Sequence, residues 1–147
     1  VANVFDNVLK CGMKPFVELS FMPRAIASGK KVGLRYRNNI TMPKNMDRWC
    51  DLIEKFIRFL FERYGEAEVR TWYFEVWNEP DLPIFFKGKQ KDYFRLYEAT
   101  ARTIKKIDPQ LRVGGPSTSA CRWVYSCFSR SLVPSSCSPW FLIWASS

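Results

Sequence analysis

The chain has 147 residues, of which 47% are hydrophobic, and its 23 Lys and Arg against 14 Asp and Glu give a formal net charge of +9 without any histidine. The absence of histidine excludes Ser-His-Asp triads, Cys-His pairs and the usual histidine-rich zinc sites within this chain. Its basic residues are scattered and lack the interleaved aromatic residues on which bases stack, so we expect no nucleic-acid partner.

The first part of the chain predicts a helix, a strand and a long loop. Residues 1–12 carry a helical apolar stripe, and Gly12 is a suitable stop. Residues 16–20 predict a short strand. Residues 23–43 are polar and basic and show neither a period of two nor one of 3.6, which predicts a long loop.

Two longer helices separate the strands that follow. Residues 49–64 have apolar side chains at three- and four-residue spacing, and Gly65 ends this helix. A second helix is expected from about 91 to 107, and a short strand at 111–113 breaks into a Gly-Gly-Pro turn. Strands separated by helices of this length predict an α/β fold with a parallel sheet. The side chains expected to face inward from the second helix are Phe94, Tyr97, Ala101, Ile104 and Ile107.

Between these helices, an alternating apolar run from Trp72 ends in Asn78-Glu79-Pro80. A strand alternates its side chains with period two, so Tyr73, Glu75, Trp77 and Glu79 are expected on one face and Phe74, Val76 and Asn78 on the other. The proline should stop the strand and hold Glu79 in an extended conformation. The pattern therefore predicts one carboxylic acid at the end of a strand.

The tetrapeptide Trp77-Asn78-Glu79-Pro80 and its surroundings resemble the retaining glycoside hydrolases of clan A. The longer context is similar to family 39, the β-xylosidases and α-L-iduronidases, and is closer to the β-xylosidase branch. The resemblance rests on four blocks in the order of that family, and we see none beyond Ala120. These blocks cover residues 14–23, 70–81, 92–97 and 112–116.

The resemblance implies a partial (β/α)₈ TIM barrel. A complete barrel needs about 250 residues, so this chain holds half of one at most. Residues 1–120 would form part of the catalytic barrel, about strands three to five with their intervening helices. Residues 121–147 would be an unmatched and irregular tail.

The family's catalytic roles transfer to few positions. Glu79 matches the general acid/base at the end of strand four, and Asn78 matches the asparagine expected to bind the sugar 2-hydroxyl. Phe21 and Phe86 are candidate sugar-binding residues, although a Phe pair in the loop at 85–86 is at least as often a hydrophobic plug. The family's nucleophile lies on strand seven, outside this chain, so the chain alone is expected to be inactive.

The expected substrate is a xyloside or xylo-oligosaccharide, and no cofactor or metal is implied. The alternatives are a fragment of an α-L-iduronidase or another clan A glycosidase, a non-catalytic carbohydrate-binding remnant, and an inactive truncated product. The five cysteines form an odd set without metal-type spacing, so a disulfide scaffold is not expected. The oligomeric state is not predicted. The compartment is not predicted either, since no signal peptide or transmembrane segment is recognised in this stretch.

Strand parity adds an expectation about the barrel interior. The apolar alternates of the three strands should face the helices, which turns Glu18, Glu75 and Arg112 toward the barrel axis. Unpaired charges there would cost several kcal/mol each, so these three residues are predicted to form a buried network. The alternative is that one or more of them reaches water.

The last segment differs in composition, because no Asp or Glu follows Asp108 and Ser, Cys and Trp become frequent. Its apolar run at 140–144 is far shorter than the roughly 20 residues that span a bilayer, so no membrane partner is expected. We interpret the tail as a translated frameshift, intron or assembly error. A genuine alternative terminus is the second interpretation, and a membrane-surface anchor the third.

Overall fold

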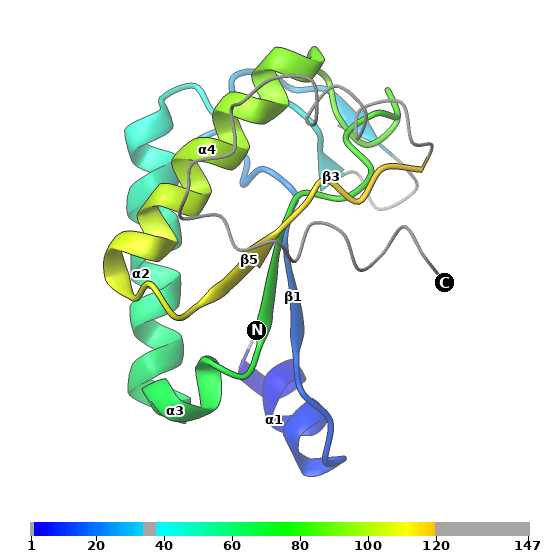
Figure 1. The fold of residues 1–147 in the computed structure, drawn as a ribbon. Coiled ribbons are helices and arrows are strands. Elements are labelled where there is room, and N and C mark those ends of the chain that lie inside the picture. The colour runs from blue at the N-terminus through cyan, green and yellow to red at the C-terminus, as the bar shows by residue number, and fades with distance from the viewer. Residues whose placement is uncertain (1, 34–37, 120–147) are drawn as a thin grey trace.

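The structure is a computed structural model, and it describes residues 2–33 and 38–119. The predicted tail at 121–147 lies outside the described residues. Helices alternate with strands along the chain (Figure 1). The elements are α1 (Ala2–Lys10), β1 (Phe16–Leu19), β2 (Val32–Gly33), β3 (Asn38–Asn39), α2 (Met46–Tyr64), α3 (Glu66–Val69), β4 (Tyr73–Val76), α4 (Gln90–Ile107) and β5 (Arg112–Gly114).

The three longer strands form one parallel sheet in the order β1-β4-β5. Leu19 is in register with Val76, and Phe74 is in register with Val113. Parallel neighbours need crossover connections, and α2 and α4 supply them. The predicted α/β fold with a parallel sheet is therefore confirmed.

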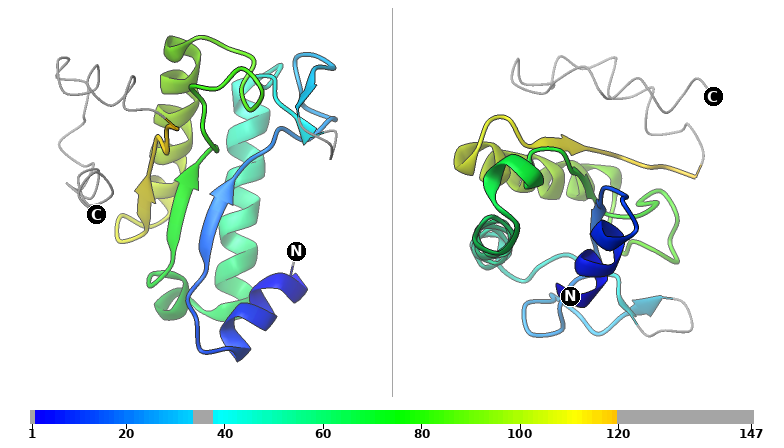
Figure 2. Two further views of the ribbon diagram at one scale, coloured as in Figure 1. Left: turned by 90° about the vertical axis from the view of Figure 1, so that its right-hand side faces the viewer. Right: turned by 90° about the horizontal axis from the view of Figure 1, so that it is seen from below.

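Helices α2 and α4 cover one side of this sheet (Figure 2). The indole N–H of Trp49 on α2 donates to the hydroxyl of Thr100 on α4 at 2.8 Å, and both side chains are buried. We call this side the helix face and the other side the opposite face. The helix face presents the apolar alternates Val17, Leu19, Phe74 and Val76, all at most 6% exposed.

Helix α2 is bounded by a capping asparagine at its start and a glycine at its end. The side chain of Asn45 accepts hydrogen bonds from the backbone N–H groups of Asp47 and Arg48, which satisfies two of the free donors of the first turn. Gly65 follows the helix with a φ of 81°, a value that glycine adopts without steric cost. The helix begins at Met46, three residues before the expected Trp49, because Asn45 caps it there.

Two short elements and part of one helix face differ from expectation. The segment predicted to be a loop contains the antiparallel pair β2 and β3, and α3 was not predicted. The fully buried side chains of α4 include Tyr93, Leu96 and Thr100, whereas Phe94, Tyr97 and Ile107 are only partly buried. Thr100 is buried because its hydroxyl is fully engaged, also donating to the carbonyl of Leu96.

The predicted network of Glu18, Glu75 and Arg112 is not formed. All three lie on the opposite face, as parity predicted, but only Glu75 is buried, at 8% exposed. Arg112 donates instead to the Tyr73 hydroxyl at 3.0 Å, with its guanidinium 5.0 Å from the ring centroid. The exposed Glu18 accepts a hydrogen bond from the Ser20 hydroxyl. The alternative, in which some of these charges reach water, is the one observed.

Candidate functional site

The candidate site lies where β1 and β4 end. The two strands are parallel and in register, so Phe21, two residues after β1, and Glu79, three residues after β4, emerge at the same edge of the sheet. In open parallel α/β sheets, ligands bind beyond the carboxyl ends of the strands. The predicted position of Glu79, at the C-terminal end of a strand parallel to its neighbours, is confirmed.

The backbone that carries Glu79 is not extended, which corrects the sequence prediction. Trp77 has a φ of 69° and Glu79 a φ of 39°, so the strand alternation stops at Val76. Trp77 therefore leaves the face of Glu75 and enters the hydrophobic core at 0% exposed. Such values cost a non-glycine residue about 1–2 kcal/mol, which the surrounding structure must offset.

Two contacts hold this irregular backbone in place. The Trp77 indole N–H donates to the carbonyl of Phe85 at 2.9 Å, which ties the strand end to the loop before α4. The N–H of Leu82 donates to the carbonyl of Glu79 at 3.0 Å and closes a turn over Pro80. Neither contact could be anticipated from a period of two, because each depends on where the loop folds back.

Aromatic rings line this edge of the sheet. Phe21 is half-buried, stacks on Phe85 with ring centroids 6.2 Å apart, and meets Trp77 edge-on at 5.7 Å. Phe86 is only 2% exposed and packs edge-on against Trp77 and Tyr93. The burial of Phe86 favours its role as a hydrophobic plug, whereas Phe21 and Phe85 keep partly accessible surfaces.

Asn78 and Glu79 are both half-buried. Among the described residues, the Glu79 carboxylate has no hydrogen-bond or salt-bridge partner. A partly accessible carboxylate without an internal partner is available to a ligand.

Further contacts join the loops around this edge. The Asp81 carboxylate accepts hydrogen bonds from the backbone N–H of Ser119 at 3.0 Å and from its hydroxyl at 3.1 Å. The β2–β3 pair connects to both strand ends, since Met22 N–H donates to the Asn39 carbonyl and Lys87 N–H donates to the Ile40 carbonyl. These contacts are not predictable from the sequence, because no spacing signal in the chain encodes them.

Two other glutamates of the strands, Glu75 and Glu18, do not reach the strand ends where Glu79 lies. Glu75 lies four residues earlier on β4, and Glu18 is its register partner on β1, so both lie below the strand ends. In the same residues, no group of three or more His, Cys, Asp or Glu side chains could hold a metal ion. No described helix is long and apolar enough to cross a membrane.

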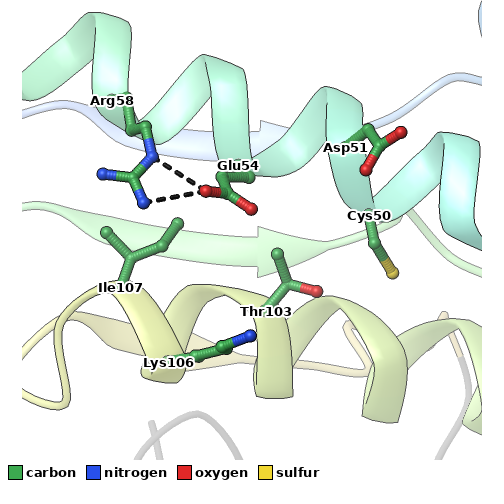
Figure 3. A pocket seen from close by; sticks show the side chains of 7 residues that line it. All are labelled: Cys50, Asp51, Glu54, Arg58, Thr103, Lys106 and Ile107. Carbon is green, nitrogen blue, oxygen red and sulfur yellow. Dashed lines mark hydrogen bonds and ion pairs between the residues drawn. The ribbon is translucent and has the colours of Figure 1, made fainter.

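A separate cavity of about 310 Å³ lies between α2 and α4 (Figure 3). It is lined by polar and charged side chains of both helices, including Cys50, Glu54, Arg58, Thr103 and Lys106. Arg58 and Glu54 pair with each other across one helical turn. None of the residues at the strand ends lines this cavity, so it is not part of the candidate site.

Comparison with known proteins places this geometry in a family. The model of "Glycosyl hydrolases family 39" matches residues 1–136, which extends past the position where we see the resemblance end. The chain is 52% identical over 125 residues to a β-xylosidase of Caldicellulosiruptor saccharolyticus, covering 84% of this chain and 26% of that protein. It is 37% identical over 73 residues to human α-L-iduronidase, covering 48% of this chain and 11% of that protein.

Solved structures give the same result. The crystal structure of a monomeric β-xylosidase from Caulobacter crescentus CB15 superposes with a TM-score of 0.81 at 48% identity, covering 85% of this chain and 25% of that one. The chain thus spans about a quarter of the length of the β-xylosidases it matches. On its sequence and on the position of its strand-terminal glutamate, the chain belongs to glycosyl hydrolase family 39.

Proposed function

We propose that the chain supplies the acid/base half of a retaining β-xylosidase-type active site, with Glu79 as the general acid/base. The observation that carries this proposal is the placement of Glu79 at the C-terminal end of β4, on the edge of the sheet that also carries Phe21. Residues 1–120 then correspond to strands three to five of a (β/α)₈ barrel, with β1, β4 and β5 as those strands. The tail at 121–147 has no role in the proposal.

The chemistry follows from the position of one carboxyl group. In a retaining glycosidase, one carboxyl protonates the leaving oxygen while a second, about 5–5.5 Å away, attacks the anomeric carbon and forms a covalent intermediate. Glu79 donates that proton and then, as a carboxylate, takes one from the water that releases the sugar. The nucleophile is provided by a part of the barrel outside this chain.

The neighbours of Glu79 are proposed to bind the sugar. Asn78 would hold the 2-hydroxyl, where a hydrogen bond strengthens in the transition state. Phe21 would present its ring to the C–H face of the sugar. Phe86 was a second candidate for this stacking, but a side chain that is 2% exposed offers no surface to a ligand, and we assign it to packing.

A β-xyloside is the favoured substrate class, and no cofactor enters the reaction. The two curated β-xylosidases match 80% or more of this chain at 48% identity or better, whereas the mammalian α-L-iduronidases match about half of it at 37% or less. An α-L-iduronidase or another clan A glycosidase is the second candidate. A non-catalytic carbohydrate-binding remnant is the third.

An activity assay of the isolated chain tests whether it lacks the nucleophile. We expect the purified 147-residue chain to show no turnover of an aryl β-xyloside, because loss of one member of a cooperating catalytic set costs orders of magnitude in rate. Glu79→Gln serves as the control. Turnover that this substitution abolishes would mean that the chain, or a pair of chains, contains a nucleophile.

A chimera tests the role of Glu79 directly. Residues 1–119 would replace the matching quarter of the Caulobacter crescentus β-xylosidase, and Glu79→Ala would be made in that protein. For an acid/base, we expect a large loss of kcat on xylosides with poor leaving groups, a smaller loss on activated aryl xylosides, and rescue by azide with formation of a xylosyl azide. Glu62→Gln, an exposed residue of α2, is the matched control. Uniform loss on all substrates without azide rescue would contradict the assignment.

A further inference from the structure

Glu18 and Glu75 are register partners in the pairing of β1 with β4. Register partners in a parallel sheet point to the same side, and neighbouring strands lie about 4.8 Å apart. The two carboxyl groups therefore occupy adjacent positions on the opposite face of the sheet. They stand directly below the strand ends that carry Phe21 and Glu79.

Glu75 is buried, and the described part of the chain offers its carboxyl no compensating partner. It is 8% exposed, and no hydrogen bond or ion pair of its carboxyl group is found among the described residues. A buried carboxylate without a partner is costly, and such a group commonly keeps its proton instead.

The charged and titratable groups around Glu75 do not neutralise it. On β1 it faces Glu18, which is exposed and accepts the Ser20 hydroxyl. On β5 its register partner is Gly114, and the cation of that strand, Arg112, donates to the Tyr73 hydroxyl two register rows away. Tyr73 is the titratable neighbour of Glu75 on β4, and its hydroxyl already accepts the hydrogen bond from Arg112.

We propose that Glu75 and Glu18 form a pH-sensitive pair in which the Glu75 carboxyl retains its proton, and that loss of this proton weakens the pairing of β1 with β4 beneath the catalytic edge. In the protonated state, only Glu18 carries a charge and the two side chains can lie together. In the ionised state, two adjacent carboxylates repel each other across the β1–β4 pair. The inference depends on the sheet geometry and stands whether or not Glu79 acts as an acid/base.

Electrostatics support this geometry. Burial, and then the negative charge of Glu18, raise the pKa of Glu75 from its ordinary 4.5 to about 7. The folded state then holds a proton that the unfolded state has already lost between these two values, so stability falls as the pH rises through this window. Above it, both states are ionised and the loss is complete.

The test is a titration of the full 147-residue chain followed through its glutamate side-chain carbonyl carbons by NMR. We expect one carboxyl to titrate near pH 7 and its signal to disappear from the spectrum in Glu75→Gln. In Glu18→Gln the same signal should titrate at lower pH, because the repelling charge is gone. Glu62→Gln, an exposed residue of α2, should leave it unchanged.

Urea unfolding gives a second readout. Between pH 4.5 and pH 7 the folding equilibrium of the chain should fall on the order of a hundredfold more than that of Glu75→Gln, since one pKa unit corresponds to a factor of ten. A Glu75 carboxyl that titrates at its ordinary 4.5 would overturn the proposal. An unchanged titration midpoint in Glu18→Gln would also overturn it, since the two groups would not interact.

Discussion

The two faces of the β1-β4-β5 sheet differ in how deeply their side chains are buried. The helix face is packed by α2 and α4, so that Val17, Leu19, Phe74 and Val76 are all at most 6% exposed. On the opposite face, Phe16 and Tyr73 are 55% and 40% exposed although they belong to the same strands. Apolar burial, the main favourable term in folding, is therefore concentrated on one side of the sheet.

The two faces also differ in which side chains they carry. The charged residues of the strands, Glu18, Glu75 and Arg112, all lie on the opposite face, where no described helix packs. The site at Glu79 lies at the edge shared by both faces, and its aromatic neighbour Trp77 is anchored in the core. The carboxyl proposed as the acid/base is thus positioned by the packed side of the sheet, while the charged side chains of the strands occupy the other side.

The largest test of this comparison uses one residue type on both faces. Phe74→Ala should destabilise the chain by about 3–5 kcal/mol, because it leaves a cavity in the core. Phe16→Ala should cost about 1 kcal/mol or less, since this ring is 55% exposed. Urea unfolding followed by tryptophan fluorescence measures both. Equal losses would show that the opposite face is also packed in solution.

A smaller effect is expected at Asp108, a buried carboxylate that has partners. Asp108 is 5% exposed, accepts from Arg70 at 2.6 Å and from the Gln110 backbone N–H at 2.8 Å. Asp108→Ala should cost about 2–3 kcal/mol at neutral pH, because charged hydrogen bonds are lost and Arg70 is left without this partner. Glu66→Ala removes the exposed partner of Arg70 and should cost much less.

The pH dependence at Asp108 should be opposite in sign to that at Glu75. Burial alone would raise the pKa of Asp108, but the Gln110 amide and Arg70 more than offset it and hold the pKa below its usual 3.8. Its contribution is therefore present above the unfolded pKa and lost as the pH falls through the lower folded value. Unfolding of wild type and Asp108→Asn between pH 5 and pH 2 measures it. A wild-type stability that rises on acidification in this range relative to Asp108→Asn would contradict this sign.

The sequence predicted the helices and the parallel sheet because their signals are local. A stripe at three- and four-residue spacing identifies α2 and α4, and period two places Glu18, Glu75 and Arg112 on one face. The conformation at Trp77 and Glu79 was not predictable in this way. It depends on the Trp77 indole reaching Phe85, a contact set by how the loop returns.

The candidate site was predicted in part for the same reason. The position of Glu79 follows from the end of a strand, which a sequence shows well. The burial of Phe86 and the tie between Asp81 and Ser119 are tertiary contacts, and no local pattern encodes them. The β2–β3 pair has two residues in each strand, too few for a period to appear.

A still smaller effect is expected for the polar contact between α2 and α4. Thr100→Val keeps the shape of the side chain but leaves the buried Trp49 indole N–H without its acceptor, which should cost about 1–2 kcal/mol. Thr103→Val on the same helix removes a hydroxyl that donates to the Ala99 carbonyl of its own helix, and should cost about 0.5 kcal/mol or less. Comparable losses for the two variants would show that the contact between α2 and α4 adds nothing.

The smallest effect is expected for the cation on the opposite face. Arg112 is exposed, and its guanidinium lies 5.0 Å from the Tyr73 ring centroid while donating to the hydroxyl. An exposed contact of this kind contributes about 0.5–1 kcal/mol, so Arg112→Met should lower the unfolding free energy by about that amount. Arg102→Met on α4, whose partner is the exposed Glu98, is the matched control and should change it less. A loss at Arg112 as large as that of Phe74→Ala would mean that this face contributes to the core, which would end the distinction between the two faces.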